Sequence, residues 1–272
     1  MFLVSGLAVL ALVLVVLASP RHRTFYFRWA DPRPVLNTAA IVSVVRGATA
    51  APAAIVTRRQ TLVPDGEGLK VPMTDEPPLR LPLEGVPAGW ELHEFAGTAD
   101  VTVVRGQRGP AVQLRSARSS FALHRDLVVS LEEFPILTWS WKVDRLPAEG
   151  DVRQASRDDQ AAQVYVVFPH WPAPRTQSEV IGYVWDTTTP VGTTLTSRKS
   201  PNVKIVVVES GPAHLGSWQV QKRDVAADFQ KLFGRRAPRV GTIAIMIDSN
   251  DTGTDAAATI ADLTFARATA KE

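Results

Sequence analysis

The chain of 272 residues contains no cysteine. It therefore forms no disulfides, zinc-thiolate sites or iron–sulfur clusters, and no cysteine acts as a nucleophile. The sequence also lacks the G-x-S-x-G, H-E-x-x-H, phosphate-loop and dinucleotide motifs, and its five histidines show no metal-ligand spacing. These absences leave clusters of acidic side chains as the main candidates for binding or catalysis, and they predict no resident cofactor.

Positive charge is absent from the start of the chain, although an apolar run begins there. Residues 2–19 carry no charge, and as a helix rising about 1.5 Å per residue they would just cross a bilayer. A cleaved signal peptide normally has lysine or arginine before its apolar run. Here Arg21 and Arg23 follow the run instead, and this order favours a retained single-pass transmembrane anchor over residues 1–20.

Aromatic and basic side chains cluster directly after this run, as they do where a transmembrane helix meets lipid headgroups. The predicted membrane interface consists of Arg21, Arg23, Phe25, Tyr26, Phe27, Arg28 and Trp29. The positive-inside rule then predicts a bacterial inner-membrane protein whose remaining chain lies in the cytoplasm. A hydrophobic patch on a folded domain is the alternative interpretation of the same residues.

The net charge of +3 is unevenly distributed along the chain. Residues 1–60 carry a net +6 and the remainder carries −3, so the excess of basic residues does not indicate nucleic-acid binding. Basic residues beside the apolar run instead indicate a membrane surface. We expect a juxtamembrane arm and a proline-rich linker over residues 21–81, and a globular domain over residues 82–272.

Short β-rich runs separated by turn residues fill the chain from residue 82 onward. In LTWSWKV, Leu137, Trp139 and Trp141 alternate with polar residues, as in a strand with one buried face. About ten such runs predict a mostly β fold, a jelly-roll-type β-sandwich preceded by the N-terminal transmembrane helix and extended arm. The predicted strands are Trp90–Phe95, Asp100–Arg105, Ala111–Arg115, Ser120–His124, Ile136–Val143, Gln163–Phe168, Val180–Trp185, Lys204–Glu209, Ser217–Gln221, Val240–Ile247 and Ala257–Phe265.

One short helix is predicted within this sandwich. Asp224 can cap its N-terminus, and Gly234 can end it. Val225, Phe229 and Phe233 fall between them at a spacing of four residues, which places all three on one face. We expect that face to pack against the core of the sandwich.

Two acidic segments supply the candidate ligand or cation-binding residues Asp158, Asp159, Asp248, Asn250, Asp251 and Asp255. The first two precede a predicted strand, and the other four lie in IDSNDTGTD between two strands. The second segment resembles the start of a calcium loop, but the twelfth position from Asp248 is Thr259 rather than the bidentate Glu. We expect a turn that closes a hairpin. An oxygen-ligated Ca²⁺ site and a pair of catalytic carboxylates are the alternatives.

Seven tryptophans are present in the sequence. Trp139, Trp141, Trp185 and Trp218 occupy strand-like runs, and we expect them in the core. Trp171 lies in the proline-flanked segment PHWPAP, which is typical of an exposed loop. An exposed aromatic ring can stack on a sugar or anchor a protein interface, so Trp171 joins the candidate ligand-binding residues.

Four blocks of sequence, in this order, resemble a bacterial family. They are WSWKVDRLPAEGDVRQASRDDQAAQVYVVFP, IGYVWDTTTPVGT, SWQVQKRDVAADFQKLFG and IAIMIDSNDTGTDAAATIADLTF. Over roughly residues 85–267 the chain is similar to the domain-of-unknown-function family 3047. The resemblance implies a jelly roll related to carbohydrate-binding modules. It also implies export to the periplasm, whereas the positive-inside rule predicts the cytoplasm.

The sequence departs from the family pattern beside the acidic segments. Gln160 stands where an aromatic residue usually follows the paired aspartates, and Gln163 stands where an arginine usually precedes the V-Y-V-V-F strand. Residues 259–261 replace an aromatic–glycine pair before the last strand. If those family residues form a sugar site, this chain retains only part of it.

These patterns suggest three functions: an accessory subunit, a carbohydrate-binding module and a hydrolase. The anchor, the interface and the long arm favour a non-catalytic, membrane-anchored accessory subunit that docks onto and stabilises a larger membrane complex, photosynthetic or respiratory. Trp171 and the 248–255 loop favour the alternative, an envelope carbohydrate-binding module. A carbohydrate-active hydrolase that uses Asp158 or Asp159 with Asp251 is the least favoured. The predicted partners are the bilayer, the subunits of that complex and carbohydrate, without nucleic acid.

Overall fold

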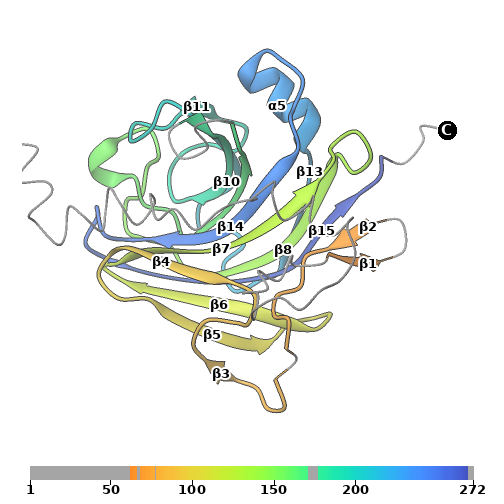
Figure 1. Ribbon diagram of the computed structural model, residues 1–272. Helices are drawn as coiled ribbons and strands as arrows, with labels where there is room; N and C mark the ends of the chain where they lie inside the picture. Colours follow the sequence, from red (N-terminus) through yellow and green to blue (C-terminus); the bar gives the residue numbers. More distant parts are fainter. Residues whose placement is uncertain (1–61, 66–67, 77, 171–176, 269–272) are drawn as a thin grey trace, which may run out of the picture. The chain divides into compact units, whose positions relative to one another are not determined.

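The chain folds as a β-sandwich of two facing sheets (Figure 1). This computed structural model describes residues 62–65, 68–76, 78–170 and 177–268. The predicted anchor, the predicted membrane interface and Trp171 all lie outside the described residues. Within the described part of the chain, the helices are too short or too polar to cross a membrane.

Sheet A contains eight of the described strands. They are β1 (Val63–Asp65), β2 (Gly68–Lys70), β3 (Leu83–Glu84), β5 (Asp100–Arg105), β6 (Pro110–Ala117), β8 (Ile136–Arg145), β13 (Gln219–Asp224) and β15 (Asp255–Ala266). The long strand β15 is central, because it pairs with β8 on one side and with β6 and then β2 on the other. β1 and β2 lie in the segment predicted as a linker, so the sheet begins before residue 82.

Sheet B contains seven described strands in the order β11-β12-β10-β9-β14-β7-β4. They are β4 (Glu91–Ala96), β7 (Ser120–Val129), β9 (Ala162–Phe168), β10 (Glu179–Asp186), β11 (Thr194–Thr196), β12 (Val203–Ser210) and β14 (Val240–Asp248). The chain changes sheets repeatedly, for example between β7 and β8, as it does in jelly rolls. The predicted mostly β sandwich with one helix is confirmed.

The segment between β14 and β15 does not close a hairpin, because these two strands belong to opposite sheets. The prediction of a hairpin here was wrong, since the alternation of residues in a strand does not reveal which sheet the next strand joins. The segment does turn tightly. Gly253 has a φ of 65°, and the backbone N–H of Thr254 donates to the carbonyl of Ser249 at 3.2 Å.

The hydrophobic core lies between the two sheets and is rich in aromatic rings. The rings of Trp139 and Tyr183 lie 5.4 Å apart between centroids, and those of Trp141 and Trp185 lie 6.0 Å apart. Each pair joins β8 of sheet A to β10 of sheet B. The structure confirms the core positions predicted for these three tryptophans, whereas Trp218 is only half-buried. Such ring pairs stabilise the packing of one sheet on the other by more than their buried area alone would contribute.

The helix α5 (Val225–Phe233) follows β13 and agrees with its predicted boundaries. The Asp224 carboxylate accepts a hydrogen bond from the backbone N–H of Ala227 at 2.9 Å, and Gly234 ends the helix with a φ of 74°. Phe229 is fully buried, and its ring lies 4.6 Å from that of Phe168 on β9. Local capping signals in the sequence therefore placed this helix correctly.

Candidate functional site

The strands of sheet B have one face in the core and one face directed outward. On β14, Ile243, Ile245 and Ile247 are fully buried in the core, and the residues between them face the other way. Paired residues on neighbouring strands share a face, so the strand registers identify the other residues of this surface. We name it the outer face of sheet B; its central residues are Glu91, His93, Ala122, His124, Gln163, Tyr165, Ala244 and Met246.

A row of paired residues crosses the outer face of sheet B. It contains Glu91, His124, Ala244, Tyr165 and Gly182, from β4, β7, β14, β9 and β10 in turn. Ala244 separates the two ring-bearing residues. Because neighbouring strands lie about 4.8 Å apart, the backbones of His124 and Tyr165 are about 10 Å apart across it. The row therefore places one ring on each side of a small residue.

Tyr165 is held in place by Gly182 of its own row and by Gln163 of the next row. A Cβ atom on Gly182 would lie 2.5 Å from Cε1 of Tyr165, so only glycine lets this ring pack over β10. The Tyr165 hydroxyl donates to Oε1 of Gln163 at 2.5 Å. Burial raises the pKa of Tyr165, and the charges of Asp158 and Asp248 add to the rise, so the phenol stays neutral.

Acidic residues from the two predicted segments meet at one end of this face. Asp158 and Asp159 precede β9, Asp248 ends β14, and Asp251 follows it. The Asp159 carboxylate accepts hydrogen bonds from the backbone N–H groups of Asp251 at 3.1 Å and Thr252 at 2.6 Å. The structure therefore joins two segments that lie about 90 residues apart in the sequence.

Lys199 supplies the positive charge at this site. Its Nζ lies 2.8 Å from Asp251 Oδ2, 3.9 Å from Asp248 Oδ2 and 4.0 Å from Asp158 Oδ2. Burial acts to lower the pKa of Lys199, but the hydrogen bond to Asp251 and the nearby carboxylates raise it overall. We call Asp158, Asp159, Asp248, Asp251 and Lys199 the acidic cluster. Sequence reasoning missed Lys199, which stands in no motif and lies 41 residues from Asp158.

Two carboxyl groups of the acidic cluster, those of Asp158 and Asp248, are hard to ionise. Burial raises the pKa of Asp248 to about 8; a hydrogen bond with Asp159 and the charge of Asp159 also raise it, whereas Lys199 opposes the rise. Burial likewise raises the pKa of Asp158, although Gln160 Nε2 donates to Asp158 at 3.0 Å and opposes the shift. Asp248 is therefore mostly protonated at pH 7.

The remaining predicted residues lie apart from the centre of the cluster. Asn250 Nδ2 donates to Asp251 at 3.0 Å, and Asp255 forms an exposed ion pair with Arg145 at 3.0 Å. Over the described ranges, no three acidic or histidine side chains converge in a way that could hold a metal ion. Ca²⁺ prefers six to eight oxygen ligands, whereas here the ammonium of Lys199 already lies among the carboxylates. The cluster therefore fits an ammonium better than Ca²⁺.

A second acidic site at this end of sheet B was not predicted. The Asp151 carboxylate accepts from Nε and Nη2 of Arg153, both at 2.8 Å, and from the Thr189 hydroxyl at 3.0 Å. Asp186 accepts from the backbone N–H groups of Val152 at 2.9 Å and Thr189 at 2.6 Å. The sequence DTTT carries a signal for it, because Asp followed by Thr residues favours Asx turns. These contacts fix two loops to each other.

The fold and the site define a two-sheet β-sandwich with an acidic cluster on the outer face of one sheet. The chain belongs to the family described as "Protein of unknown function (DUF3047)", whose model matches residues 88–264. This match confirms the resemblance found in the sequence. No curated protein sequence matches the chain.

Several solved structures are similar to this chain. An endoglucanase from Rhodothermus marinus has a TM-score of 0.39 at 9% identity, with 68% of this chain and 97% of that chain covered. The xyloglucanase domain of NopAA from Sinorhizobium fredii scores 0.38 at 9% identity, with 68% and 96% covered. A family 11 xylanase from Neocallimastix patriciarum scores 0.36 at 10% identity, with 68% and 94% covered. TM-scores this low establish no functional relationship.

Proposed function

We propose that this protein binds carbohydrate, without cleaving it, on the outer face of sheet B. One observation carries the proposal: β4, β7, β9 and β14 bring ring-bearing side chains and the acidic cluster onto the same face. Sugar recognition uses this combination, because rings pack on the apolar faces of the sugar and a few polar groups fix its hydroxyls.

Lys199 and Asp251 are the polar groups best placed to meet a ligand. The Lys199 side chain is 49% exposed, and its ammonium is only 2.8 Å from the Asp251 carboxylate. One sugar hydroxyl can accept from the ammonium while its neighbour donates to the carboxylate. His124 and Tyr165 then provide ring surfaces across Ala244 for the adjoining part of the sugar.

Binding is better supported than hydrolysis. Glycoside hydrolysis needs two carboxyl groups that flank the scissile bond and reach the substrate. Asp158, Asp159 and Asp248 are almost fully buried, and the Lys199 ammonium lies against two of them. The raised pKa of Asp248 would suit a general acid, but its carboxyl faces Asp159 and Lys199. This supports a non-catalytic role over the hydrolase interpretation.

The membrane-anchored accessory subunit stays a prediction. The anchor and the interface residues that suggested it lie outside the described residues, and the described ones add nothing in its favour. Carbohydrate binding, in contrast, rests on side chains whose positions are described. We therefore favour the carbohydrate-binding alternative.

The test is titration of the full chain with cello-, xylo- and galacto-oligosaccharides, in a detergent without a sugar headgroup. We expect Lys199→Gln and His124→Ala each to weaken binding about ten-fold, the loss of one charge-assisted hydrogen bond or one ring contact. Lys142→Gln, on the outer side of sheet A, removes the same charge and serves as the control. Absence of binding at millimolar sugar, or equal affinity in all three variants, would overturn the proposal.

A further inference from the structure

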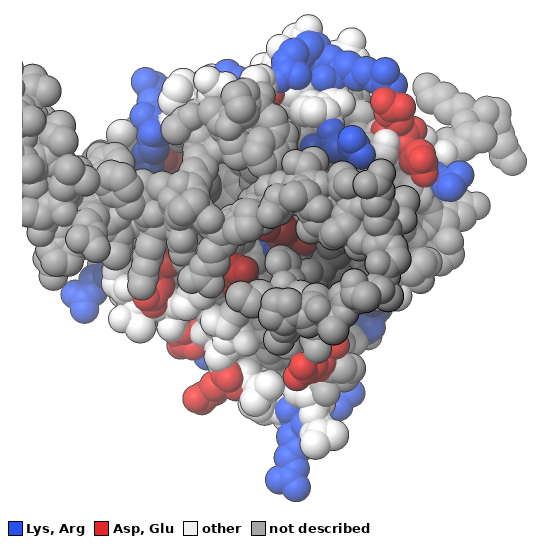
Figure 2. Space-filling model, viewed as in Figure 1, with Lys and Arg blue, Asp and Glu red and all other residues white. Residues whose placement is uncertain are grey.

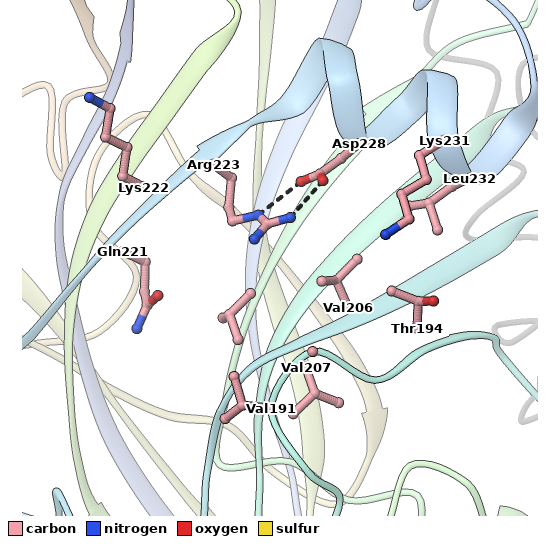
Figure 3. Close-up of a pocket in the computed structure, with 12 residues that line it drawn as sticks. Val191, Thr194, Val206, Val207, Gln221, Lys222, Arg223, Asp228, Lys231 and Leu232 are labelled. Carbon is pink, nitrogen blue, oxygen red and sulfur yellow. Dashed lines mark hydrogen bonds and ion pairs between the residues drawn. The ribbon is translucent and has the colours of Figure 1, made fainter.

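A pocket of about 250 Å³ lies beside the helix α5 (Figure 3). It is bordered by β12, β13, α5 and the chain that leads into β11. Val191, Val206 and Val207 form an apolar part of its lining, and Leu232 of α5 adds to it. The pocket therefore offers both an apolar floor and the polar groups contributed by β13 and α5.

The polar groups of this pocket are mainly cationic. Lys222, Arg223 and Lys231 line it, whereas Asp228 is the one carboxylate among its lining residues. Figure 2 shows lysine and arginine side chains gathered around α5, at the top of the view. The positive charge of the pocket thus exceeds what its own carboxylate neutralises.

Arg223 is held in a fixed orientation. Its Nε donates to Asp228 Oδ2 at 2.9 Å and its Nη2 donates to Asp228 Oδ1 at 2.6 Å. The buried Tyr183 hydroxyl also donates to Asp228, at 2.9 Å. Since a guanidinium has five N–H donors, three of them remain uncommitted to Asp228. This arrangement orients the free side of the guanidinium before any ligand arrives.

Lys231 approaches the same space from α5. Figure 3 shows its amine directed toward the side of the pocket on which Arg223 lies, while Lys222 points away. Within the described part of the chain, Lys231 makes no ion pair. A fixed guanidinium and an unpaired ammonium therefore face one pocket above an apolar floor.

We propose that this pocket binds a small molecule bearing an oxyanion, either a carboxylate or a phosphate, held between Arg223 and Lys231. A planar guanidinium pairs with two oxygens of such a group, and an ammonium acts as a second point charge. The valines contact the apolar remainder of the ligand. Pockets for drug-sized ligands have roughly 300–1,000 Å³, so the smaller volume here selects a compact acid or monophosphate rather than a nucleotide.

The test uses inorganic phosphate and acetate as probes, with the full chain and with ionic strength held constant by sodium chloride. Nuclear magnetic resonance follows the backbone amides of Gly192 and Thr194 and the side-chain Nε–H of Arg223. We expect at least one probe to shift these signals saturably. Saturation by phosphate alone would identify phosphate esters as the ligand class, and saturation by acetate alone would identify carboxylates.

Lys231→Gln is the decisive variant, because it removes an unpaired charge on an exposed helix surface and leaves the buried Asp228 contacts intact. We expect it to weaken probe binding about five-fold or more, with Lys142→Gln as the matched charge control that changes it less than about two-fold. Arg223→Lys, which keeps the charge and loses the fork, should fall in between. Absence of saturable shifts, or equal losses in Lys231→Gln and Lys142→Gln, would overturn the proposal. None of these outcomes depends on sugar binding at sheet B.

Discussion

Asp151 and Asp248 are buried to nearly the same extent, with 4% and 3% of their surfaces exposed, but their pKa values shift in opposite directions. Hydrogen bonds from Arg153, and then from Gln154 and Thr189, hold the pKa of Asp151 below its usual range against the effect of burial. Burial raises the pKa of Asp248 to about 8. The difference shows that a small exposed surface alone does not decide whether a carboxyl is charged, because hydrogen-bond donors dominate at Asp151 and desolvation dominates at Asp248.

The two acidic sites therefore have different roles. Asp151 accepts five hydrogen bonds from groups on two loops, and its charge is matched by Arg153. Asp248 accepts a long hydrogen bond, 3.4 Å, from the backbone N–H of Asn250, shares one with Asp159, and lies 3.9 Å from a lysine. The first site fixes the loops, whereas the second brings carboxyl groups together with a half-exposed ammonium.

The largest effect is expected from Asp151→Ala. The substitution removes the acceptor for the Arg153 fork and leaves the buried Thr189 hydroxyl without this partner, so we expect a loss of about 2–3 kcal/mol in the free energy of unfolding. Urea denaturation measures it. Asp100→Ala, at an exposed ion pair with Arg115, is the control and should change stability by less than about 0.5 kcal/mol. Equal effects would remove the distinction between the two kinds of carboxylate.

A pH-dependent effect of intermediate size is expected from Asp248→Asn. The folded state raises the pKa of Asp248 from 3.8 to about 8, so the folded protein binds this proton more tightly than the unfolded chain does. The resulting stabilisation is complete below pH 4 and is lost as the pH rises toward 8. The amide of the Asp248→Asn variant does not ionise, so the variant does not lose this stability as the pH rises. Between pH 5 and 8 we expect the variant to gain stability relative to the wild type steadily, by up to about 1.4 kcal/mol per pH unit. Parallel pH profiles in urea denaturation would contradict the raised pKa.

The smallest effect on stability is expected from Lys199→Gln. The lysine is half exposed, so its charge is screened, and we expect a change of less than about 1 kcal/mol. Its removal should nevertheless raise the pKa of Asp248 further, because Lys199 opposes that shift in the wild type. Carbon-13 resonance of the Asp248 carboxyl as a function of pH measures this. A lower or unchanged pKa would show that Lys199 does not act on Asp248.

Much of the fold followed from local sequence patterns. The predicted strand Asp100–Arg105 coincides with β5, and every other predicted strand overlaps an observed one. Strands β1, β2, β3 and β11 escaped prediction, because two or three residues are too few to show alternation. The acidic segments were recognised in the sequence, but the sequence did not predict that Lys199 lies among them.

The sequence alone determined where strands alternate, where α5 begins and ends, and which side chains enter the core, because alternation and capping depend on neighbours along the chain. Only the tertiary structure decided that β14 and β15 belong to opposite sheets, and that Lys199 lies among aspartates 41 to 52 residues away. Burial and charge at Asp248 arise from groups that meet only after both sheets have formed. A local pattern records that a residue is buried, but the partners it meets there depend on the packing of distant segments.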